Sequence, residues 1–160
     1  MSNKAETLLD LAINANALIA TAESCTAGLI SAEITSAAGS SAIFDRGFAT
    51  YTNAAKIELL DVSPDTIARH GAVSEETARE MADGAMKHSD ASLTVSVTGI
   101  AGPGGSEFKP EGRVCFGLAR KNAETVTQTI EFGAIGRESV RRATVDHALD
   151  LLIAALKRDA

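Results

Sequence analysis

The sequence predicts an α/β protein, a three-layer α/β/α sandwich with a mixed sheet. Helix-like and strand-like segments alternate early in the chain, as parallel strands with helical crossovers require. Two strand-like segments then follow one another late in the chain, which is typical of an antiparallel pair. The length of 160 residues, 45% of them hydrophobic, suits one core. Residues 1–160 are therefore expected to form a single domain.

In the first half, apolar spacing and capping signals define the elements. Residues 3–15 have apolar positions at helical spacing. Gly39 is a C-terminal stop signal, and Asn53 is a candidate N-cap. The expected elements are a helix over 3–15, a strand over 18–22, a helix over 27–38, a strand over 48–51 and a short helix that contains Lys56. The first strand therefore runs directly into a helix.

In the second half, the clearest signal is a helix start at Ser74. Its hydroxyl suits an N-cap, and Glu75 and Glu76 suit the positive end of the helix dipole. The apolar stripe of this helix continues to Met86. The expected elements after it are a strand over 93–98, a glycine-rich loop over 99–112, antiparallel strands over 114–119 and 125–132, and a closing helix over 137–157.

Composition excludes several classes of partner. The chain has 21 acidic and 15 basic residues, a formal net charge of −6, and no long basic run, so nucleic acid is not an expected partner. No stretch approaches the ~20 apolar residues of a membrane-spanning helix, and the polar N-terminus does not resemble a secretory signal. Cys25 and Cys115 have neither metal-site nor disulfide-framework spacing. We expect a cytoplasmic protein.

The first candidate site is the strand-to-helix turn at residues 21–26. A hydroxyl at this place lies beside helix N-terminal N–H groups, which can stabilise an oxyanion or hold a phosphate. Ser24 or Thr26 could equally be a simple N-cap. Cys25 could be the nucleophile, but a thiol needs a base such as histidine, and no histidine of the chain stands in an obvious motif. We therefore favour Ser24.

A serine nucleophile without a histidine needs another base. A lysine can serve if burial lowers its pKa. Lys56 is the best candidate, because residues 48–55 before it are uncharged. Tyr51, the single tyrosine, could orient groups in the same pocket. A solvated lysine and a packed tyrosine are the plainer alternatives.

The third candidate is the glycine-rich run over residues 98–106. Glycines let a backbone approach a ligand closely and direct several N–H groups at an anion. The run lacks the Gly-Lys-Ser/Thr of a phosphate-binding Walker loop, and a strand follows it. A flexible hairpin connection is the alternative.

The fourth candidate lies at the start of the closing helix. Arg137 and Arg141 are four residues apart and share a helix face. Cations at a helix N-terminus oppose the dipole, which favours an anion between them. Glu138 allows a simple surface ion pair instead.

Together, these segments resemble the CinA C-terminal domain family in order and spacing. The motifs that carry the resemblance are Ala22–Thr26, Gly39–Ser41 with Phe44–Gly47, Thr50–Lys56, Gly71–Glu75, and Thr98–Gly105 with Lys109–Pro110. They extend over essentially the whole chain. The family usually has two glycines after the first motif, where this chain has Ala27 and Gly28.

The resemblance implies hydrolysis of an amide: nicotinamide mononucleotide (NMN) and water give nicotinate mononucleotide and ammonia. It implies that Ser24 attacks the carboxamide, that Lys56 is the base or steadies developing charge, and that Tyr51 supports the pair. Amides near Cys25 and Thr26 would stabilise the oxyanion. The remaining residues expected to bind this small nucleotide are Glu23, Thr98, Gly99, Ala101, Gly102 and Arg137, with Arg141 or Arg142. No metal or cofactor is expected.

Two other functions stay open at this point. One is a non-catalytic nucleotide-binding or regulatory module, in which Ser24 is only a cap. The other is a hydrolase of a different pyridine or pterin nucleotide. The apolar face of the last helix and an Ala-rich surface also favour a homodimer.

Overall fold

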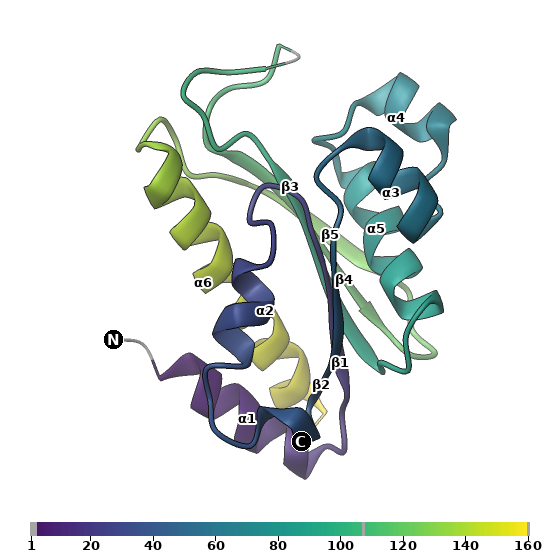
Figure 1. Cartoon of the computed structure of the whole chain (residues 1–160), viewed down its shortest axis with the longest axis vertical. Helices are drawn as coiled ribbons and strands as arrows, with labels where there is room; N and C mark the ends of the chain where they lie inside the picture. Colours follow the sequence, from purple (N-terminus) through teal and green to yellow (C-terminus); the bar gives the residue numbers. More distant parts are fainter. Residues whose placement is uncertain (1–2, 107, 160) are drawn as a thin grey trace.

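The computed structural model describes residues 3–106 and 108–159, which form three layers (Figure 1). The middle layer is a five-stranded sheet in the order β2-β1-β3-β4-β5. Its strands are β1 (Ile19–Glu23), β2 (Phe44–Ala49), β3 (Leu93–Gly99), β4 (Arg113–Arg120) and β5 (Val126–Glu131). The helices are α1 (Lys4–Asn14), α2 (Leu29–Ile34), α3 (Asn53–Leu60), α4 (Pro64–His70), α5 (Glu75–Lys87) and α6 (Arg137–Arg158), with a short 3₁₀ turn, η1 (Ser40–Ala42).

The sheet is mixed, as the sequence predicts. Strand β1 pairs in parallel with β2 and β3, whereas β4 is antiparallel to both β3 and β5. Helices α1, α2 and α6 cover one face, and α3, α4 and α5 cover the other (Figure 1). The predicted three-layer α/β/α sandwich is therefore confirmed.

The larger core lies between the sheet and the α1, α2 and α6 layer. It includes Leu8, Ile30, Val95, Phe116 and Leu152, all fully buried. The apolar face of α6 belongs to this core, since Val140, Ala148 and Ala155 are also fully buried. These positions are thus covered within one chain and are not available to a second copy. The homodimer stays a prediction, without this support.

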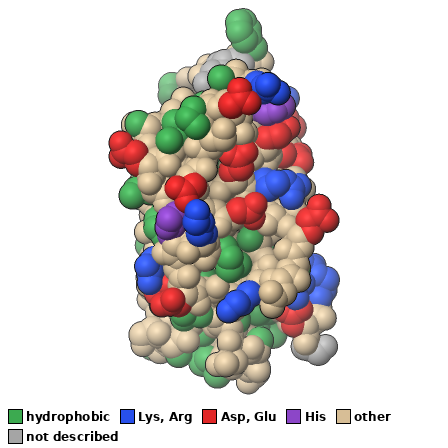
Figure 2. Space-filling model, turned by 90° about the vertical axis from the view of Figure 1, so that its right-hand side faces the viewer, with side chains coloured by type: hydrophobic (Ala, Val, Ile, Leu, Met, Phe, Trp, Pro, Cys, Tyr) green, Lys and Arg blue, Asp and Glu red, His purple; other side chains and the backbone are tan. Residues whose placement is uncertain are grey.

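On the opposite face, a glycine sets how closely α3 approaches α5. A Cβ at Gly84 would lie 2.0 Å from the backbone carbonyl oxygen of Leu60, a separation that no side chain permits. Helix α3 can therefore rest directly on α5, and its inner side, with Lys56 and Leu60, is buried. Figure 2 shows the outer surface of this layer, where acidic and basic side chains of the described residues are interspersed.

Two expected elements have wrong bounds. The helix expected over 27–38 spans only Leu29–Ile34, because Ala27 and Gly28 have positive φ angles of 47° and 108°. The strand expected over 48–51 is Phe44–Ala49, since the chain leaves the sheet at Thr50. Helix α4 was not expected, although Ser63 caps it and Pro64 occupies its first position, which is a recognised start signal.

Candidate active site

A pocket of about 330 Å³ lies where the three parallel strands end. Because β1, β2 and β3 are parallel, their carboxyl ends meet at one edge of the sheet, the usual place for a ligand in such folds. Ser24 follows β1, Tyr51 and Lys56 follow β2, and the glycine-rich loop follows β3. Arg137, the first residue of α6, completes the wall.

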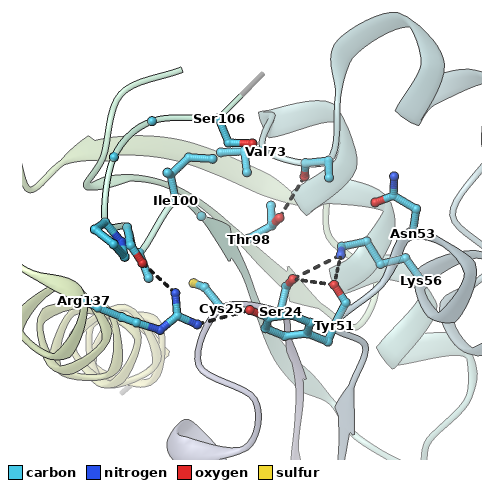
Figure 3. Close-up of a pocket in the computed structure, with 17 residues that line it drawn as sticks. Ser24, Cys25, Tyr51, Asn53, Lys56, Val73, Thr98, Ile100, Ser106 and Arg137 are labelled. Carbon is cyan, nitrogen blue, oxygen red and sulfur yellow. Dashed lines mark hydrogen bonds between the residues drawn. The ribbon is translucent and has the colours of Figure 1, made fainter. Parts of the chain in front are cut away.

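Ser24 and Lys56 form a hydrogen-bonded pair in this pocket (Figure 3). Lys56 Nζ donates to Ser24 Oγ at 3.1 Å and to the backbone carbonyl oxygen of Tyr51 at 3.2 Å. The Lys56 side chain is 1% exposed, and Ser24 is 8% exposed. A separation of 3.1 Å is within reach for proton transfer between a nucleophile and a base.

Tyr51 contributes to this arrangement through two different groups. Its backbone carbonyl oxygen contacts Lys56, and it also lies 3.5 Å from Ser24 Oγ. Its phenol points elsewhere: the ring is 59% exposed, and the hydroxyl accepts a hydrogen bond from Arg137 Nη2 at 3.2 Å. The structure therefore places the backbone of Tyr51 at the Ser24–Lys56 pair and its side chain at the pocket rim.

Cys25 also lines the pocket, but its thiol is poorly suited to attack. Burial raises the pKa of Cys25 to about 12, and the negative charge of Glu23 adds to the rise. The thiol therefore stays protonated near neutral pH, and the thiolate is the reactive form of cysteine. This favours Ser24 over Cys25 as the nucleophile.

Glu23 lies outside the pocket lining, with its carboxylate buried at the start of α2. It is 1% exposed and accepts hydrogen bonds from the amides of Gly28, Ile30 and Ser31 at 3.2, 2.9 and 3.0 Å. The hydroxyls of Thr26 and Ser31 also donate to it, at 2.6 and 2.9 Å. The carboxylate thus anchors the turn that carries Ser24.

These contacts bear on two expectations from the sequence. Glu23 and Thr26 were expected to bind substrate, but Thr26 is fully buried and its hydroxyl serves Glu23. The oxyanion was assigned to amides near Cys25 and Thr26, and that assignment stays a prediction; the amides of Gly28, Ile30 and Ser31, further along the turn, donate to the Glu23 carboxylate instead. The hydrogen bonds of a buried carboxylate take precedence, because leaving such a charge unsatisfied is costly.

The glycine-rich loop forms another wall of the pocket that holds Ser24 and Lys56. This wall includes the predicted residues Thr98, Gly99, Ala101 and Gly102. The Thr98 hydroxyl donates to the carbonyl of Ala72 at 2.8 Å, which joins the loop to the segment before α5. Gly102 has a φ angle of +90°, a conformation that favours glycine. Its carbonyl accepts a hydrogen bond from Arg137 Nη1 at 2.7 Å.

Arg141 and Arg142 do not line the pocket. Arg141 donates to the backbone carbonyls of Cys25 and Thr26, at 3.0 and 3.4 Å, and so braces the Ser24 turn from outside. Arg142 forms an exposed ion pair with Glu138 at 3.1 Å. Arg137, with Arg141 or Arg142, was expected at the phosphate, and of these three candidates the structure brings only Arg137 to the pocket, because Arg141 donates to the Ser24 turn and Arg142 points to solvent.

The pocket also contains residues that were not expected there. They are Asn53, Ala72 and Val73, whereas Ile100, Pro103, Gly104, Gly105 and Ser106 also line it and lie in the candidate run over residues 98–106. Asn53 was expected to cap α3, but Thr52 is the cap and Asn53 lines the pocket. The loop residues belong to the glycine-rich run, whose composition was the available signal.

The described residues lack both a cluster of metal ligands and a membrane-spanning helix. Within residues 3–106 and 108–159, no group of three or more His, Cys, Asp and Glu side chains is placed to hold a metal ion. In the same part of the chain, none of the helices has the length and hydropathy needed to cross a membrane.

Comparison with known proteins gives consistent matches along the chain. The profile of the CinA C-terminal domain matches residues 1–156. A nicotinamide-nucleotide amidohydrolase PncC of Escherichia coli (strain K12) is 49% identical over 137 residues, which cover 85% of this chain and 82% of that protein. A CinA-like protein of Mycobacterium sp. (strain JLS) is 48% identical over 91% of this chain, which spans only 35% of that longer protein.

A solved structure agrees with the fold. The competence/damage inducible protein CihA of Agrobacterium tumefaciens superposes with a TM-score of 0.90 at 45% identity, and 98% of each chain is covered. At this identity the likeness extends beyond the order of strands and helices to much of the sequence that builds them.

Proposed function

The chain belongs to the CinA C-terminal domain family, and we propose that it hydrolyses the carboxamide of NMN to nicotinate mononucleotide and ammonia. The observation that carries this proposal is the hydrogen bond between Lys56 Nζ and Ser24 Oγ at the base of a nucleotide-sized pocket. The PncC name of the Escherichia coli relative at 49% identity supports the choice of substrate.

In the proposed reaction, Ser24 Oγ attacks the carboxamide carbon while neutral Lys56 Nζ takes the hydroxyl proton. Collapse of the tetrahedral intermediate breaks the C–N bond, and Lys56 returns the proton to the departing ammonia. Water then attacks the resulting ester, with its proton passing to Lys56 and from there to the Ser24 oxygen. The acid product is released and both side chains are restored.

The rest of the pocket would hold the nucleotide. Arg137 and the backbone amides of the glycine-rich loop would bind the phosphate, because guanidinium and amide donors suit its oxygens. The backbone amides of Cys25 and Thr26, which directly follow Ser24, would stabilise the oxyanion. Cys25 and Cys115 are free, buried thiols, which is typical of proteins from a reducing compartment. The proposed site of the reaction is therefore the cytoplasm. Its proposed role there is the recycling of pyridine nucleotides.

Ammonia release across a panel of nucleotides tests this proposal. The panel contains NMN, its nucleoside, an amide-bearing dinucleotide and a pterin nucleotide. We expect release from NMN at a kcat/KM at least tenfold above the other compounds. Ammonia release from another compound alone would show that this compound, and not NMN, is the substrate. Binding of nucleotides without any ammonia release would indicate a non-catalytic module.

A further inference from the structure

Glu111 lies on the limb of the glycine-rich loop that returns to β4, and its carboxylate joins two parts of the molecule. Its Oε1 accepts a hydrogen bond from the Gly104 amide at 2.7 Å. Its Oε2 accepts one from the amide of Gly136, the N-cap of α6, at 3.3 Å. The carboxylate thus bridges the loop and the helix end that carries Arg137.

Two other contacts join the glycine-rich loop to the start of α6 and to Glu111. The Gly102 carbonyl accepts a hydrogen bond from Arg137, so the loop and α6 are also joined in the opposite sense, with the helix residue as donor. A Cβ at Gly102 would lie 2.5 Å from Glu111 Cδ, which shows that the carboxylate packs directly against the Gly102 backbone. Glu111 and Arg137 together hold the segment from Gly102 to Gly104.

We propose that Glu111 is a positioning residue for the phosphate end of the pocket. It does not line the pocket, so it acts through Gly104, Gly136 and Arg137 rather than by touching the substrate. In the free protein it holds the loop and the arginine in the arrangement that receives a phosphate. This inference rests on the proposed function, which assigns the phosphate to Arg137 and the loop.

The charge of Glu111 and its positioning role predict opposite effects on phosphate binding when Glu111 is removed. Glu111 carries a negative charge close to the proposed phosphate site, so its removal would strengthen phosphate binding if charge were its only contribution. Positioning predicts weaker binding, because a loosened loop must be ordered when the nucleotide binds. The sign of the change in KM therefore separates the two effects.

The kinetic test compares Glu111→Ala with Glu138→Ala. Glu138 lies in the first turn of α6 and pairs with Arg142, so its removal takes one negative charge from the same helix end without touching the loop. For Glu111→Ala we expect the KM for NMN to rise about tenfold, the order of one charge-assisted hydrogen bond, with kcat within about twofold. The KM for the nucleoside should not change. Glu138→Ala should leave the KM for NMN unchanged or lower.

A second measurement needs no substrate. Hydrogen exchange of the Gly104 and Gly136 amides, followed by NMR at rapid time points, should be several times faster in Glu111→Ala than in the unmodified protein. Glu111→Gln keeps an acceptor for one of the two amides and should protect only that one. Amides of the sheet should exchange at unchanged rates in both variants.

The outcomes separate this inference from the proposed function. If the unmodified protein releases no ammonia from NMN, the proposed function fails, and the exchange rates still decide whether Glu111 holds the loop. Unchanged exchange at Gly104 and Gly136 would overturn the inference. A KM for NMN that stays the same or falls in Glu111→Ala would overturn it as well.

Discussion

Lys56 Nζ lies 3.1 Å from Ser24 Oγ, although 32 positions separate the two residues in the chain. The contact is made because β1 and β2 are parallel neighbours, so that the segments following them meet at one edge of the sheet. Close packing of α3 on α5 at Gly84 then holds the inner side of α3, with Lys56, in the interior. The pair is thus a product of strand topology and helix packing together.

The first prediction concerns Lys56. Replacing Lys56 with Met keeps most of the buried volume and removes the amine, so kcat should fall by about 10²–10⁴-fold, the usual contribution of general-base catalysis. Lys87→Met, at an exposed ion pair with Asp61, is the matched control and should keep full activity. Steady-state kinetics with NMN measure both. A Lys56→Met protein that retains its kcat would give Lys56 a structural role only.

The second prediction concerns the Cys25 thiol. Because burial raises its pKa to about 12, the thiolate fraction stays very small from pH 7 to pH 9. Iodoacetamide should therefore leave Cys25 unmodified and activity intact over that range, as followed by intact mass and ammonia release. Cys25→Ser should also keep most activity. Rapid, stoichiometric labelling of Cys25 with loss of turnover would instead favour the thiol as nucleophile.

The third prediction separates the three arginines near the start of α6. Arg137→Ala should weaken NMN binding by about one to two decades, and nucleoside binding should be nearly unaffected, since only the nucleotide has the phosphate. Arg141→Ala should weaken both ligands equally, because Arg141 braces the Ser24 turn. Arg142→Ala is the surface control. Calorimetric Kd values for both ligands check this. If Arg137→Ala lost equal affinity for NMN and for the nucleoside, Arg137 would not be a phosphate ligand.

The fourth prediction concerns the buried carboxylate of Glu23. In Glu23→Gln, one oxygen becomes an NH₂ group that faces backbone or hydroxyl donors, so the free energy of unfolding should fall by about 1–3 kcal/mol. Glu33→Gln, at a half-buried position of α2, should change it by less than ~0.5 kcal/mol. Urea unfolding measures both variants. Equal stability of Glu23→Gln and the unmodified protein would mean that the carboxylate does not anchor the turn.

The features predictable from the sequence have local signals. The start of α5 at Ser74 and the antiparallel order of β4 and β5 follow from capping and alternation, and both are present. Ser24, Lys56 and Arg137 were selected by chemical type beside turns and helix ends, and the structure brings all three to one pocket.

The remaining features depend on three-dimensional packing. The contacts of Glu23 arise because Ala27 and Gly28 take positive φ angles and turn the amides of α2 back onto it. The sequence prediction missed this turn because it started the helix at residue 27. Arg141 shares a helix face with Arg137, but it lies one turn further along α6, beside the carbonyls of Cys25 and Thr26. Helical spacing alone does not distinguish these two positions.

The role of Ser24 as nucleophile is the central claim, and Ser24→Ala tests it most directly. The variant should release no ammonia from NMN above background, while its Kd for NMN stays within about tenfold of the unmodified protein, since the hydroxyl makes the covalent bond but few of the binding contacts. Calorimetry and ammonia release on the same preparation give both values. A Ser24→Ala protein that turns over NMN at a near-normal rate would contradict the account.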